Sequence, residues 1–342
     1  MAISRLGMEI KINKVLYTSL EAMRDRVQED VVNFLSEWYN DSPTIIGHTS
    51  GSTGVPKPIT LLKRDMQASA RLTNRFLGID DKSTLLLCLS PSYIAGKMMI
   101  VRAIEAGAHL VVVKPSSTPL LDITEPITMA AMVPMQVAET LRCADGQKQL
   151  SNIEQLLVGG APVDEQLESQ LVMLPTITYV TYGMTETVSH VALRRVGEAF
   201  YTAIGDVTFT TDNRSCLVID APQLSGSRFV TNDVVELVDT CRFKWLGRYD
   251  NVIMSGGLKF CAEQLEEKIA HLIRNRFYIT AAPDERLGQH VVLMIEGDAY
   301  DNARLQQLRE DMSQHLARYE MPRDIRFVDK FQETSSGKVK RL

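Results

Sequence analysis

The sequence predicts an α/β fold. A large, doubly wound α/β domain with a small antiparallel β subdomain is expected first, followed by a small mobile C-terminal α+β domain. Up to about residue 180, short β-rich runs alternate with helical stretches, which favours a parallel sheet. From about residue 200 to 246, short strands alternate with turn residues, which is typical of antiparallel structure. After Gly247 a further set of helices and strands follows.

Composition and charge exclude several classes of protein. The 342 residues are 45% hydrophobic and 23% charged, which is typical of a globular protein of about two domains. A net charge of −5 argues against nucleic acid or an anionic membrane as the main partner. The sequence contains neither an apolar run of about 20 residues nor an apolar signal core. The five cysteines form no C-x-x-C pair. Reduced thiols and a cytoplasmic location are therefore expected.

The first elements are predicted from apolar spacing. Apolar residues recur at helical spacing from Leu20 to Trp38, with Thr18 and Glu21 placed as a capping box. Thr44–Ile46 then has the composition of the end of a buried strand. The further strands predicted for the sheet are 85–89, 110–113, 156–158 and 176–181.

The sequence predicts a domain boundary at residues 248–251. Residues 1–247 form the large domain, with its β subdomain at about 200–246, and residues 248–342 form the C-terminal domain. In the C-terminal domain, residues 262–273 are apolar at helical spacing, and a second helix carries Leu305, Leu308, Met312 and Leu316 on one face. The strands predicted there are 277–281, 290–296 and 325–328.

The segment HTSGSTGVPK, residues 48–57, is the most informative motif. Its glycines allow backbone N–H groups to turn toward an anion, its hydroxyls can donate, and its lysine supplies a point charge. These features predict a phosphate-binding loop, although the spacing is not that of a Walker A loop. A plain surface turn is the alternative. The residues of this site are Thr49, Ser50, Gly51, Ser52, Thr53, Gly54 and Lys57.

Two clusters follow predicted strands of the large domain. Gly159–Pro162 has small residues that would let a flat ring lie against the backbone, or it is an ordinary strand-to-helix turn. In YGMTE, residues 182–186, Tyr182 can stack on a base, and a glutamate beside phosphates can hold Mg²⁺. Alternatively, Glu186 is a favourable acid in the first turn of a helix.

Three more clusters lie toward the carboxyl end. Asp233, fifteen residues before Arg248, can accept from both hydroxyls of a ribose, or Asn-Asp is plain turn chemistry. GRYD at 247–250 and SGG at 255–257 suit a hinge and a backbone surface that a ligand can approach closely. The alternative is a flexible linker. SSGKVKR at 335–341 is a solvated basic tail by charge alone.

The order of these motifs is typical of one family. Together they resemble the acyl-adenylate-forming (AMP-binding) family, which includes acyl-CoA ligases, adenylation domains and luciferases. The motifs that carry the resemblance are, in order, TSGSTGVPK, GGAP, YGMTE, TND, GRYD with SGG, and SSGK. Within this family, the short length and the stretch YGMTETVSHVALRR are most similar to the o-succinylbenzoate–CoA ligases of menaquinone biosynthesis. The resemblance implies that a carboxylate attacks ATP to give an acyl-adenylate and pyrophosphate, and that CoA then takes the acyl group.

The resemblance also implies residue roles. Residues 49–57 hold the phosphates, with Thr53 and Lys57 catalytic, and Glu186 holds Mg²⁺. Asp250 is the hinge of a C-terminal lid. Lys338 bridges the acyl carboxylate and the α-phosphate, with Lys340 as an alternative. The other residues implied for ATP or CoA are Gly160, Ala161, Pro162, Tyr182, Gly183, Met184, Thr185, Asp233, Arg248, Ser255, Gly256 and Gly257.

The sequence leaves open which acid is the substrate and which molecule accepts the acyl group. The residues expected around the acid are Tyr93, Gly96, Lys97 and Ser189. Many relatives place histidine where Tyr93 stands, and the part before the phosphate loop is expected to be reduced. Lys97, Arg194 and Arg195 are candidates for pairing with a second carboxylate, or they are surface charges. Another acyl-CoA ligase, a ligase that loads a carrier protein, and a non-catalytic nucleotide-binding module are the alternative functions. A homodimer is a further expectation.

Overall fold

The computed structural model describes residues 7–48, 58–121, 123–333 and 339–341. These residues form two compact units. The large unit contains residues 7–48, 58–208 and 220–229, and the second unit contains residues 209–219 and those from 230 onward. Strands just before residue 248 thus group with the C-terminal part, whereas the sequence-based boundary at 248–251 stays a prediction.

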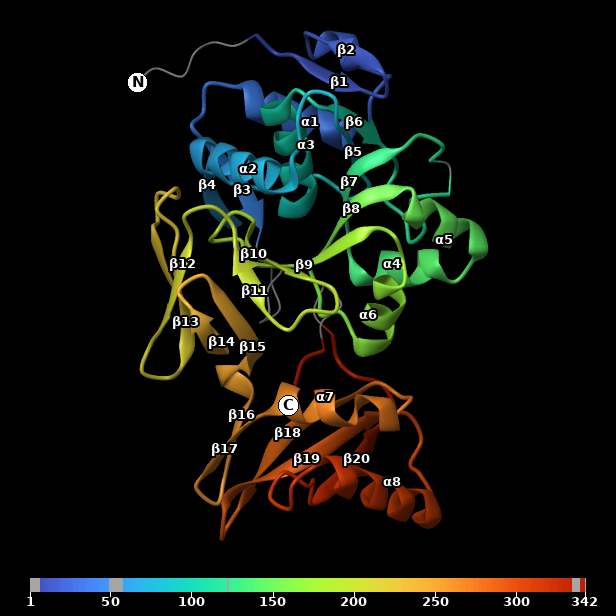
Figure 1. Cartoon of the computed structure of the whole chain (residues 1–342), viewed down its shortest axis with the longest axis vertical. Coiled ribbons are helices and arrows are strands. Elements are labelled where there is room, and N and C mark those ends of the chain that lie inside the picture. Colours follow the sequence, from blue (N-terminus) through green and yellow to red (C-terminus); the bar gives the residue numbers. More distant parts are fainter. Residues whose placement is uncertain (1–6, 49–57, 122, 334–338, 342) are drawn as a thin grey trace. The chain divides into compact units, whose positions relative to one another are not determined.

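The large unit is built on a mainly parallel sheet, shown in Figure 1. Its five central strands run parallel in the spatial order β9-β8-β7-β5-β6. Strand β1 continues the sheet in parallel beyond β6, and β2 pairs antiparallel with β1 at that end. On the other side of the central strands, β10 pairs antiparallel with β9, and β11 with β10. The strands are β1 (Ile10–Ile12), β2 (Val15–Tyr17), β5 (Thr84–Leu87), β6 (His109–Val112), β7 (Ile127–Met132), β8 (Ile153–Val158), β9 (Ile177–Gly183), β10 (His190–Arg195) and β11 (Tyr201–Ala203).

Helices cover both faces of this sheet, so the predicted doubly wound fold is confirmed. Helices α2 (Lys63–Leu77) and α3 (Ile94–Ala106) lie on one side, and α4 (Pro134–Leu141), α5 (Ala144–Ser151) and α6 (Glu165–Val172) on the other (Figure 1). The second group of helices packs on side chains that alternate along the strands, because successive residues of a strand face opposite sides. Leu86, Leu156 and Leu171 belong to this buried cluster.

The predicted helix over residues 20–38 is wrong in its first half. Residues there form the 3₁₀ turn η1 (Glu21–Met23) and an irregular segment, and α1 is confined to Glu29–Tyr39. Asp25 takes a φ of 59°, which a continuous helix does not allow. Met23 is nevertheless fully buried. The apolar spacing therefore arose from an irregular segment that also packs on the core.

The strand predicted at Thr44–Ile46 does not belong to the parallel sheet. It is β3 (Thr44–His48), which pairs antiparallel with β4 (Pro58–Leu62) in a separate two-stranded sheet. Ile45 is 2% exposed whereas Ile46 is 50% exposed. The expectation of a fully buried strand end is therefore wrong, because a two-stranded sheet covers the core with one face only.

The second unit begins with the β subdomain that the sequence predicts. Strands β12 (Thr208–Thr211), β13 (Cys216–Asp220), β14 (Arg228–Asp239) and β15 (Arg242–Arg248) are neighbours in that order. β14 and β15 are antiparallel. Phe209 on β12 packs edge to face against Phe243 on β15, with ring centroids 4.9 Å apart.

The remainder of the second unit is an α+β structure (Figure 1). Its strands lie in the order β17-β16-β19-β18, and β20 pairs with β19. Helices α7 (Ala262–Ile269) and α8 (Asn302–His315) pack on one face, with Leu265, Ile279 and Met312 in the shared core. The strands are β16 (Val252–Ser255), β17 (Leu258–Cys261), β18 (Phe277–Asp284), β19 (Gly288–Glu296) and β20 (Asp324–Val328). These elements confirm the three predicted strands and the second helix, whereas the helix predicted over residues 262–273 ends at Ile269 and a 3₁₀ turn, η3 (Ala270–Leu272), follows it.

Strands β16 and β17 were not predicted. They form a hairpin whose two-residue turn is Gly256-Gly257, with φ of 58° and 83°. Two glycines between short β-rich runs are a hairpin signal that was available in the sequence. The alternative of a flexible linker at 255–257 is therefore wrong.

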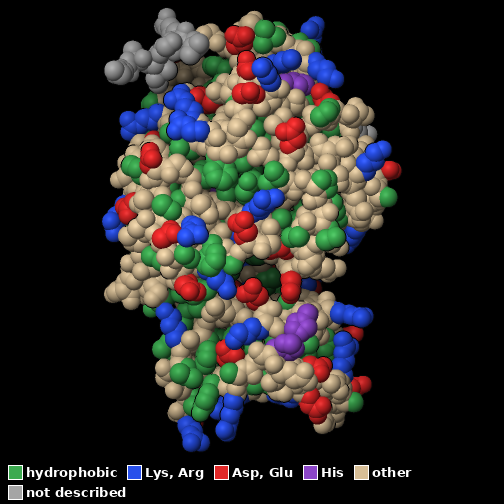
Figure 2. Space-filling view, in the orientation of Figure 1, with side chains coloured by type: hydrophobic (Ala, Val, Ile, Leu, Met, Phe, Trp, Pro, Cys, Tyr) green, Lys and Arg blue, Asp and Glu red, His purple; other side chains and the backbone are tan. Residues whose placement is uncertain are grey.

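The surface and the cysteines are those expected of a globular protein with reduced thiols. Acidic and basic side chains are interspersed over the visible face (Figure 2). None of the helices in the described ranges is long and apolar enough to cross a membrane. The five cysteines are free, and Cys88, Cys216 and Cys261 are buried, as expected for reduced thiols.

Candidate active site

Two predicted parts of the site lie outside the described residues, and their roles stay predictions. These parts are the phosphate-binding loop (Thr49, Ser50, Gly51, Ser52, Thr53, Gly54 and Lys57) and Lys338. The other predicted residues fall into two groups, one in each compact unit. Each group is described within its own unit.

In the large unit, Gly159–Pro162 leads from β8 to α6. A Cβ at Gly159 would lie 2.2 Å from Thr181 Oγ1, so only glycine lets the end of β8 approach β9 this closely. Gly160 has a φ of 87°, and Ala161 and Pro162 are exposed. The segment is a strand-to-helix loop, and its open backbone also suits the predicted contact with a flat ring.

The YGMTE motif continues from β9 into a tight loop toward β10. Thr187 Oγ1 accepts from Met184 N at 3.0 Å and contacts the carbonyl oxygen of Ser189 at 2.8 Å. Val188 is 2% exposed and has a φ of 68°, a conformation that costs a β-branched residue about 1–3 kcal/mol. The loop is therefore held in one strained conformation by its own hydrogen bonds.

Tyr182 is the last residue but one of β9, and Glu186 lies in the loop that follows. The Tyr182 ring packs against Tyr201, with centroids 5.6 Å apart. A Cβ at Gly183 would lie 2.4 Å from the Ser189 carbonyl oxygen, which requires glycine there. Glu186 is exposed in a turn and β10 follows, so the alternative that it begins a helix is wrong.

The carboxylate of Glu186 suits the implied Mg²⁺. Its oxygen atoms are the ligands that Mg²⁺ prefers. Within the described ranges no group of three or more His, Cys, Asp or Glu is placed to hold a metal. Nucleotide enzymes usually hold magnesium with one or two carboxylates and the substrate phosphates, and the role of Glu186 toward Mg²⁺ stays a prediction.

Arg102, on α3, is a functional candidate that the sequence did not reveal. It is 2% exposed, and its Nη2 donates to Ser189 Oγ at 2.8 Å. Its Nε has no partner, and no carboxylate of the described chain forms an ion pair with it. Burial lowers the pKa of Arg102 to about 10. A buried cation without a counter-ion is costly, so an anion bound beside it would stabilise it.

His190 lies next to this arginine but is not a cation. Its Nε2 is 2.9 Å from Thr73 Oγ1, and the ring is buried. Burial first, and then the charge of Arg102, hold the pKa of His190 well below its ordinary value. Of these two neighbouring residues, Arg102 therefore carries the positive charge and His190 does not.

The start of α3 carries three of the predicted acid-binding residues. Tyr93 is 64% exposed. A Cβ at Gly96 would lie 2.3 Å from the Ser90 carbonyl oxygen, so glycine lets α3 pack against that loop. Lys97 is 7% exposed, with Nζ 3.6 Å from Glu37 Oε2 and 4.8 Å from the Phe34 ring centroid. Lys97 thus already has a counter-ion, in contrast to Arg102.

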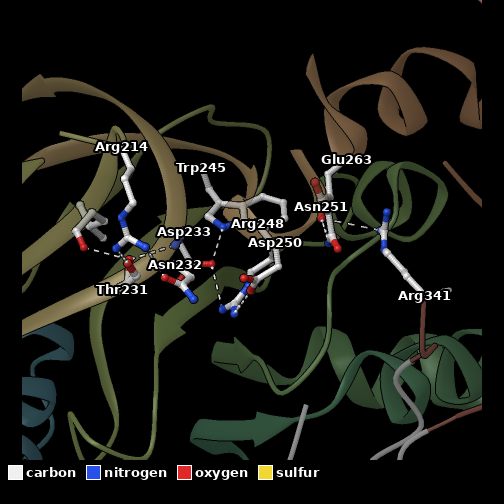
Figure 3. A network of polar contacts seen from close by, with 11 residues as sticks. Arg214, Thr231, Asn232, Asp233, Trp245, Arg248, Asp250, Asn251, Glu263 and Arg341 are labelled. Atoms are coloured by element: carbon white, nitrogen blue, oxygen red, sulfur yellow. Dashed lines mark hydrogen bonds and ion pairs between the residues drawn. The ribbon is translucent and has the colours of Figure 1, made fainter. Parts of the chain in front are cut away.

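The second unit brings the predicted ribose residues together. Asp233 on β14 lies directly opposite Arg248 on β15, and their side chains are 3.6 Å apart (Figure 3). Arg248 also donates to Asp250 at 3.0 Å. Because Asp233 lies inside a strand, the alternative of a plain turn at Asn-Asp is wrong.

One unpredicted side chain contacts Asp233, and a second contacts the two residues before it. Trp245 Nε1 donates to Asp233 Oδ1 at 3.2 Å. Arg214 donates to Asn232 Oδ1 at 2.9 Å and to the Thr231 carbonyl oxygen at 3.1 Å (Figure 3). A tryptophan or an arginine in a β-rich region carries no sequence signal of this role, because the contact depends on the pairing of strands distant in the sequence.

We expect Trp245→Phe to raise the KM for ATP by about threefold to tenfold with little change in kcat. Phenylalanine keeps most of the packing but leaves the Asp233 carboxylate without this donor. Steady-state pyrophosphate release at varied ATP concentration measures the change. Trp38→Phe, in α1, is the matched control and leaves this KM unchanged. An unchanged KM in Trp245→Phe would remove the positioning role.

The turn at Ser255–Gly257 and the carboxyl end complete the predicted set. Ser255 is 6% exposed, and Gly256 N donates to the Leu287 carbonyl oxygen at 2.9 Å. The role of this turn toward CoA stays a prediction. Arg341 pairs with Glu266, so the alternative of a solvated tail is wrong for this residue.

The fold and these residues define a nucleotide-binding α/β protein with a separate C-terminal unit. The AMP-binding enzyme family matches residues 10–225, more than half of the chain, and the chain belongs to this family. The predicted resemblance is thereby confirmed.

Individual relatives agree with that assignment. An acyl-CoA synthetase (AMP-forming)/AMP-acid ligase II-like protein from Dyadobacter fermentans is 36% identical, with 93% of both chains covered and a TM-score of 0.64. A probable 2-succinylbenzoate–CoA ligase of Mycobacterium tuberculosis is 27% identical over 90% of this chain and 85% of its own. The o-succinylbenzoate CoA synthetase of Bacillus subtilis in complex with its acyl-adenylate shares the fold, at 19% identity and a TM-score of 0.73, over 86% of this chain and 68% of that one.

Proposed function

We propose that this protein is an ATP-dependent carboxylate–CoA ligase that acts through an acyl-adenylate, with o-succinylbenzoate as its acid. The pairing of Asp233 with Arg248 in one unit and the uncompensated Arg102 beneath the YGMTE loop in the other support it. The names of relatives, which include 2-succinylbenzoate–CoA ligases of Mycobacterium tuberculosis and Lactococcus lactis, point the same way.

The chemistry matches the residues that the chain carries. A carboxylic acid of pKa about 4 is ionised at neutral pH, so its oxygen can attack the α-phosphate without a general base. The bond to the pyrophosphate oxygen then breaks. In the second step the CoA thiol gives up its proton, its sulfur attacks the acyl carbon, and AMP leaves. Bound Mg²⁺ would supply charge neutralisation at the phosphates.

The chain's own residues position the reactants. Asp233, oriented by Trp245, accepts from the ribose hydroxyls, and Arg248 lies beside it. Tyr182 and the open backbone at Gly160–Pro162 provide a surface for adenine. Lys57 and Thr53 bind the phosphates, and Lys338 bridges the two reacting groups. Positioning and charge stabilisation of this kind supply most of the catalysis in phosphoryl chemistry.

Arg102 supports an acid with two carboxylates. One carboxylate is consumed in adenylation, so a cation that no carboxylate among the described residues neutralises suits the second one. Ser189, which accepts from Arg102 at 2.8 Å, is the predicted substrate residue nearest to that charge. A CoA ester of o-succinylbenzoate is the product expected from this arrangement.

The proposal is tested by pyrophosphate release from Mg·ATP across a panel of acids, with and without CoA. Release with o-succinylbenzoate, and a thioester only when CoA is present, is the expected result. Pyrophosphate release with another acid would support the proposed ligase activity but show that o-succinylbenzoate is not the substrate. Acyl transfer to a carrier protein but not to CoA would replace the acceptor. ATP binding in calorimetry with no release from any acid would indicate a non-catalytic nucleotide-binding module.

Lys97→Ala is expected to raise the KM for o-succinylbenzoate about tenfold and that for a monocarboxylate far less. Lys97 Nζ lies 3.6 Å from Glu37 Oε2, but the Glu37 side chain is exposed, so solvent weakens this pair and a substrate carboxylate can compete for the lysine. Glu37→Gln, the matched variant, is expected to lower the KM for o-succinylbenzoate. Equal effects of Lys97→Ala on both acids would remove Lys97 from the acid site.

Assembly and location follow from the proposal as further expectations. ATP, CoA and the acid are cytoplasmic metabolites, which suits the predicted cytoplasmic location. A homodimer stays a prediction.

A further inference from the structure

A chain of polar contacts links α2, β10 and α3 inside the large unit. Thr73 Oγ1 lies 3.2 Å from the Ser69 carbonyl oxygen and 2.9 Å from His190 Nε2. His190 Nδ1 lies 3.5 Å from Ser189 Oγ, which accepts from Arg102 Nη2 at 2.8 Å. Thr73, His190 and Arg102 are 0%, 7% and 2% exposed. Polar groups buried to this extent are costly unless each of them has a partner.

The direction of these hydrogen bonds depends on which nitrogen of His190 carries the proton. Burial, together with the charge of Arg102, holds the pKa of His190 well below its ordinary value, so the ring is neutral. In a neutral ring one nitrogen donates and the other accepts. If Nδ1 donated to Ser189 Oγ, the Ser189 hydroxyl hydrogen would have no acceptor in the part of the chain that the structure describes.

A proton on Nε2 satisfies every donor of the chain. Arg102 then donates to Ser189, and the Ser189 hydroxyl donates to His190 Nδ1. His190 Nε2 donates to Thr73 Oγ1, and the Thr73 hydroxyl donates to a backbone carbonyl oxygen of α2. All of these hydrogen bonds run in one direction, away from Arg102. We therefore expect His190 to be protonated at Nε2.

The same direction also suits the charge of Arg102. It places the lone pairs of Ser189 Oγ and His190 Nδ1 toward the cation, and the hydrogen atoms away from it. Hydroxyl dipoles orient in the field of a charge, and hydrogen bonds in a chain strengthen one another. Since Arg102 has no carboxylate partner within the described ranges, this stabilisation matters more there than at Arg194, which pairs with Glu168.

The chain holds one end of the Arg102 guanidinium and leaves the rest of it for a ligand. Nη2 donates to Ser189, whereas Nη1 has only the Met99 sulfur at 3.6 Å, a weak acceptor. Nε has no partner among the described residues. Ser189 itself is half-buried, at the end of the YGMTE loop. A planar guanidinium that is held at one nitrogen presents its other N–H groups in a defined plane, which suits a carboxylate.

We propose that His190 is a positioning residue for the acid, because its Nδ1 fixes the Ser189 hydroxyl and thereby the plane of Arg102. The proposal rests on the proposed function, in which Arg102 binds the second carboxylate of the acid. His190 acts through Ser189 rather than by contact with the acid. Thr73 sets the tautomer of His190, because it supplies the acceptor for Nε2.

NMR spectroscopy of protein with ¹⁵N-labelled histidine tests the tautomer without any substrate. The chemical shifts of the two ring nitrogens distinguish a proton on Nε2 from one on Nδ1, and the His190 ring is assigned through its own backbone. The wild type is expected to carry the proton on Nε2. In Thr73→Val, Nε2 loses its acceptor, so the proton should move to Nδ1. A wild-type ring that is protonated at Nδ1 would overturn the proposal.

Steady-state kinetics test the effect on the acid. The measured quantity is the ratio of kcat/KM for o-succinylbenzoate to that for a monocarboxylate. Thr73→Val is expected to lower this ratio about tenfold and to leave the KM for ATP unchanged. Thr73→Ser retains the hydroxyl and should keep the wild-type ratio. Thr140→Val is the matched control, because Thr140 donates to the Gln136 carbonyl oxygen within α4 in the same way but lies outside this chain of contacts.

A double substitution shows whether Thr73 acts through Ser189. In a Ser189→Ala background the chain is already broken, so Thr73→Val should lower the ratio no further. Additive effects of the two substitutions, or equal loss of activity toward both acids in Thr73→Val, would overturn the positioning role. A wild-type protein that releases no pyrophosphate from any acid, yet carries the proton on Nε2, would overturn the proposed function and the positioning role but retain the tautomer.

Discussion

Lys338→Ala is expected to reduce the rate of pyrophosphate release by about 10²- to 10³-fold while thioester formation from supplied acyl-adenylate continues. A cation that contacts the carboxylate and the α-phosphate together lowers their mutual repulsion as they approach, and loss of one such contact typically has this size. The second half-reaction starts from the adenylate, in which that repulsion no longer exists. The two half-reactions, assayed separately, measure the effect.

Lys340→Ala is the matched control for this prediction. Lys340 is exposed and lies two residues from Lys338, and its contact with Gln332 uses only the backbone N–H. The substitution should therefore leave both half-reactions unchanged. If Lys340→Ala abolished adenylation and Lys338→Ala did not, Lys340 would be the residue that bridges the two reacting groups. Loss of both half-reactions in Lys338→Ala would point to a structural role instead.

Arg102→Met is expected to abolish selectivity for a dicarboxylate and to stabilise the protein. The kcat/KM for o-succinylbenzoate should fall by about 100-fold, because a buried charge pair contributes several kcal/mol to binding. Activity with a monocarboxylate should change little. The midpoint of thermal unfolding should rise by about 2–4 °C, since methionine removes a buried cation without a counter-ion. Kinetics with both acids and thermal unfolding without ligand measure the two effects.

Arg194→Met is the matched control, because it makes the same substitution at an arginine that has a carboxylate partner. Arg194 forms a two-point ion pair with Glu168, at 2.6 Å and 2.9 Å. The substitution leaves that carboxylate without its partner, so it should lower the unfolding midpoint. The ratio of activities toward the two acids should stay as in the wild type. A lower midpoint in Arg102→Met, or equal loss of activity toward both acids, would contradict the role of Arg102.

The fold was predictable where local pattern and tertiary structure agree. Strands 85–89 and 156–158 are continuous apolar runs, as expected of buried parallel strands. Residues 20–28 misled the prediction, because Met23 is buried at a helical interval from Val27 although the backbone is irregular. Burial alone produced that spacing, and Asp25 with its positive φ has no clear signal in the sequence.

The site was predictable where a motif carries its own chemistry. Asp233 and Arg248 were singled out fifteen residues apart, and strand pairing places them opposite each other. Arg102 was missed because an arginine in an apolar helix pattern is indistinguishable from a surface charge until its burial is known. Arg341 was interpreted as a solvated cation, since its partner Glu266 lies 75 residues away.

The most direct test of the acyl-adenylate mechanism is to trace an ¹⁸O label from the acid into AMP. If o-succinylbenzoate labelled with ¹⁸O in its carboxylates is incubated with ATP, Mg²⁺ and CoA, the attacking oxygen stays on phosphorus when the thiol cleaves the acyl–oxygen bond. An acyl-adenylate route therefore gives one ¹⁸O atom in each AMP released, measured by mass spectrometry. AMP without label, or label found in phosphate instead, would contradict an acyl-adenylate route.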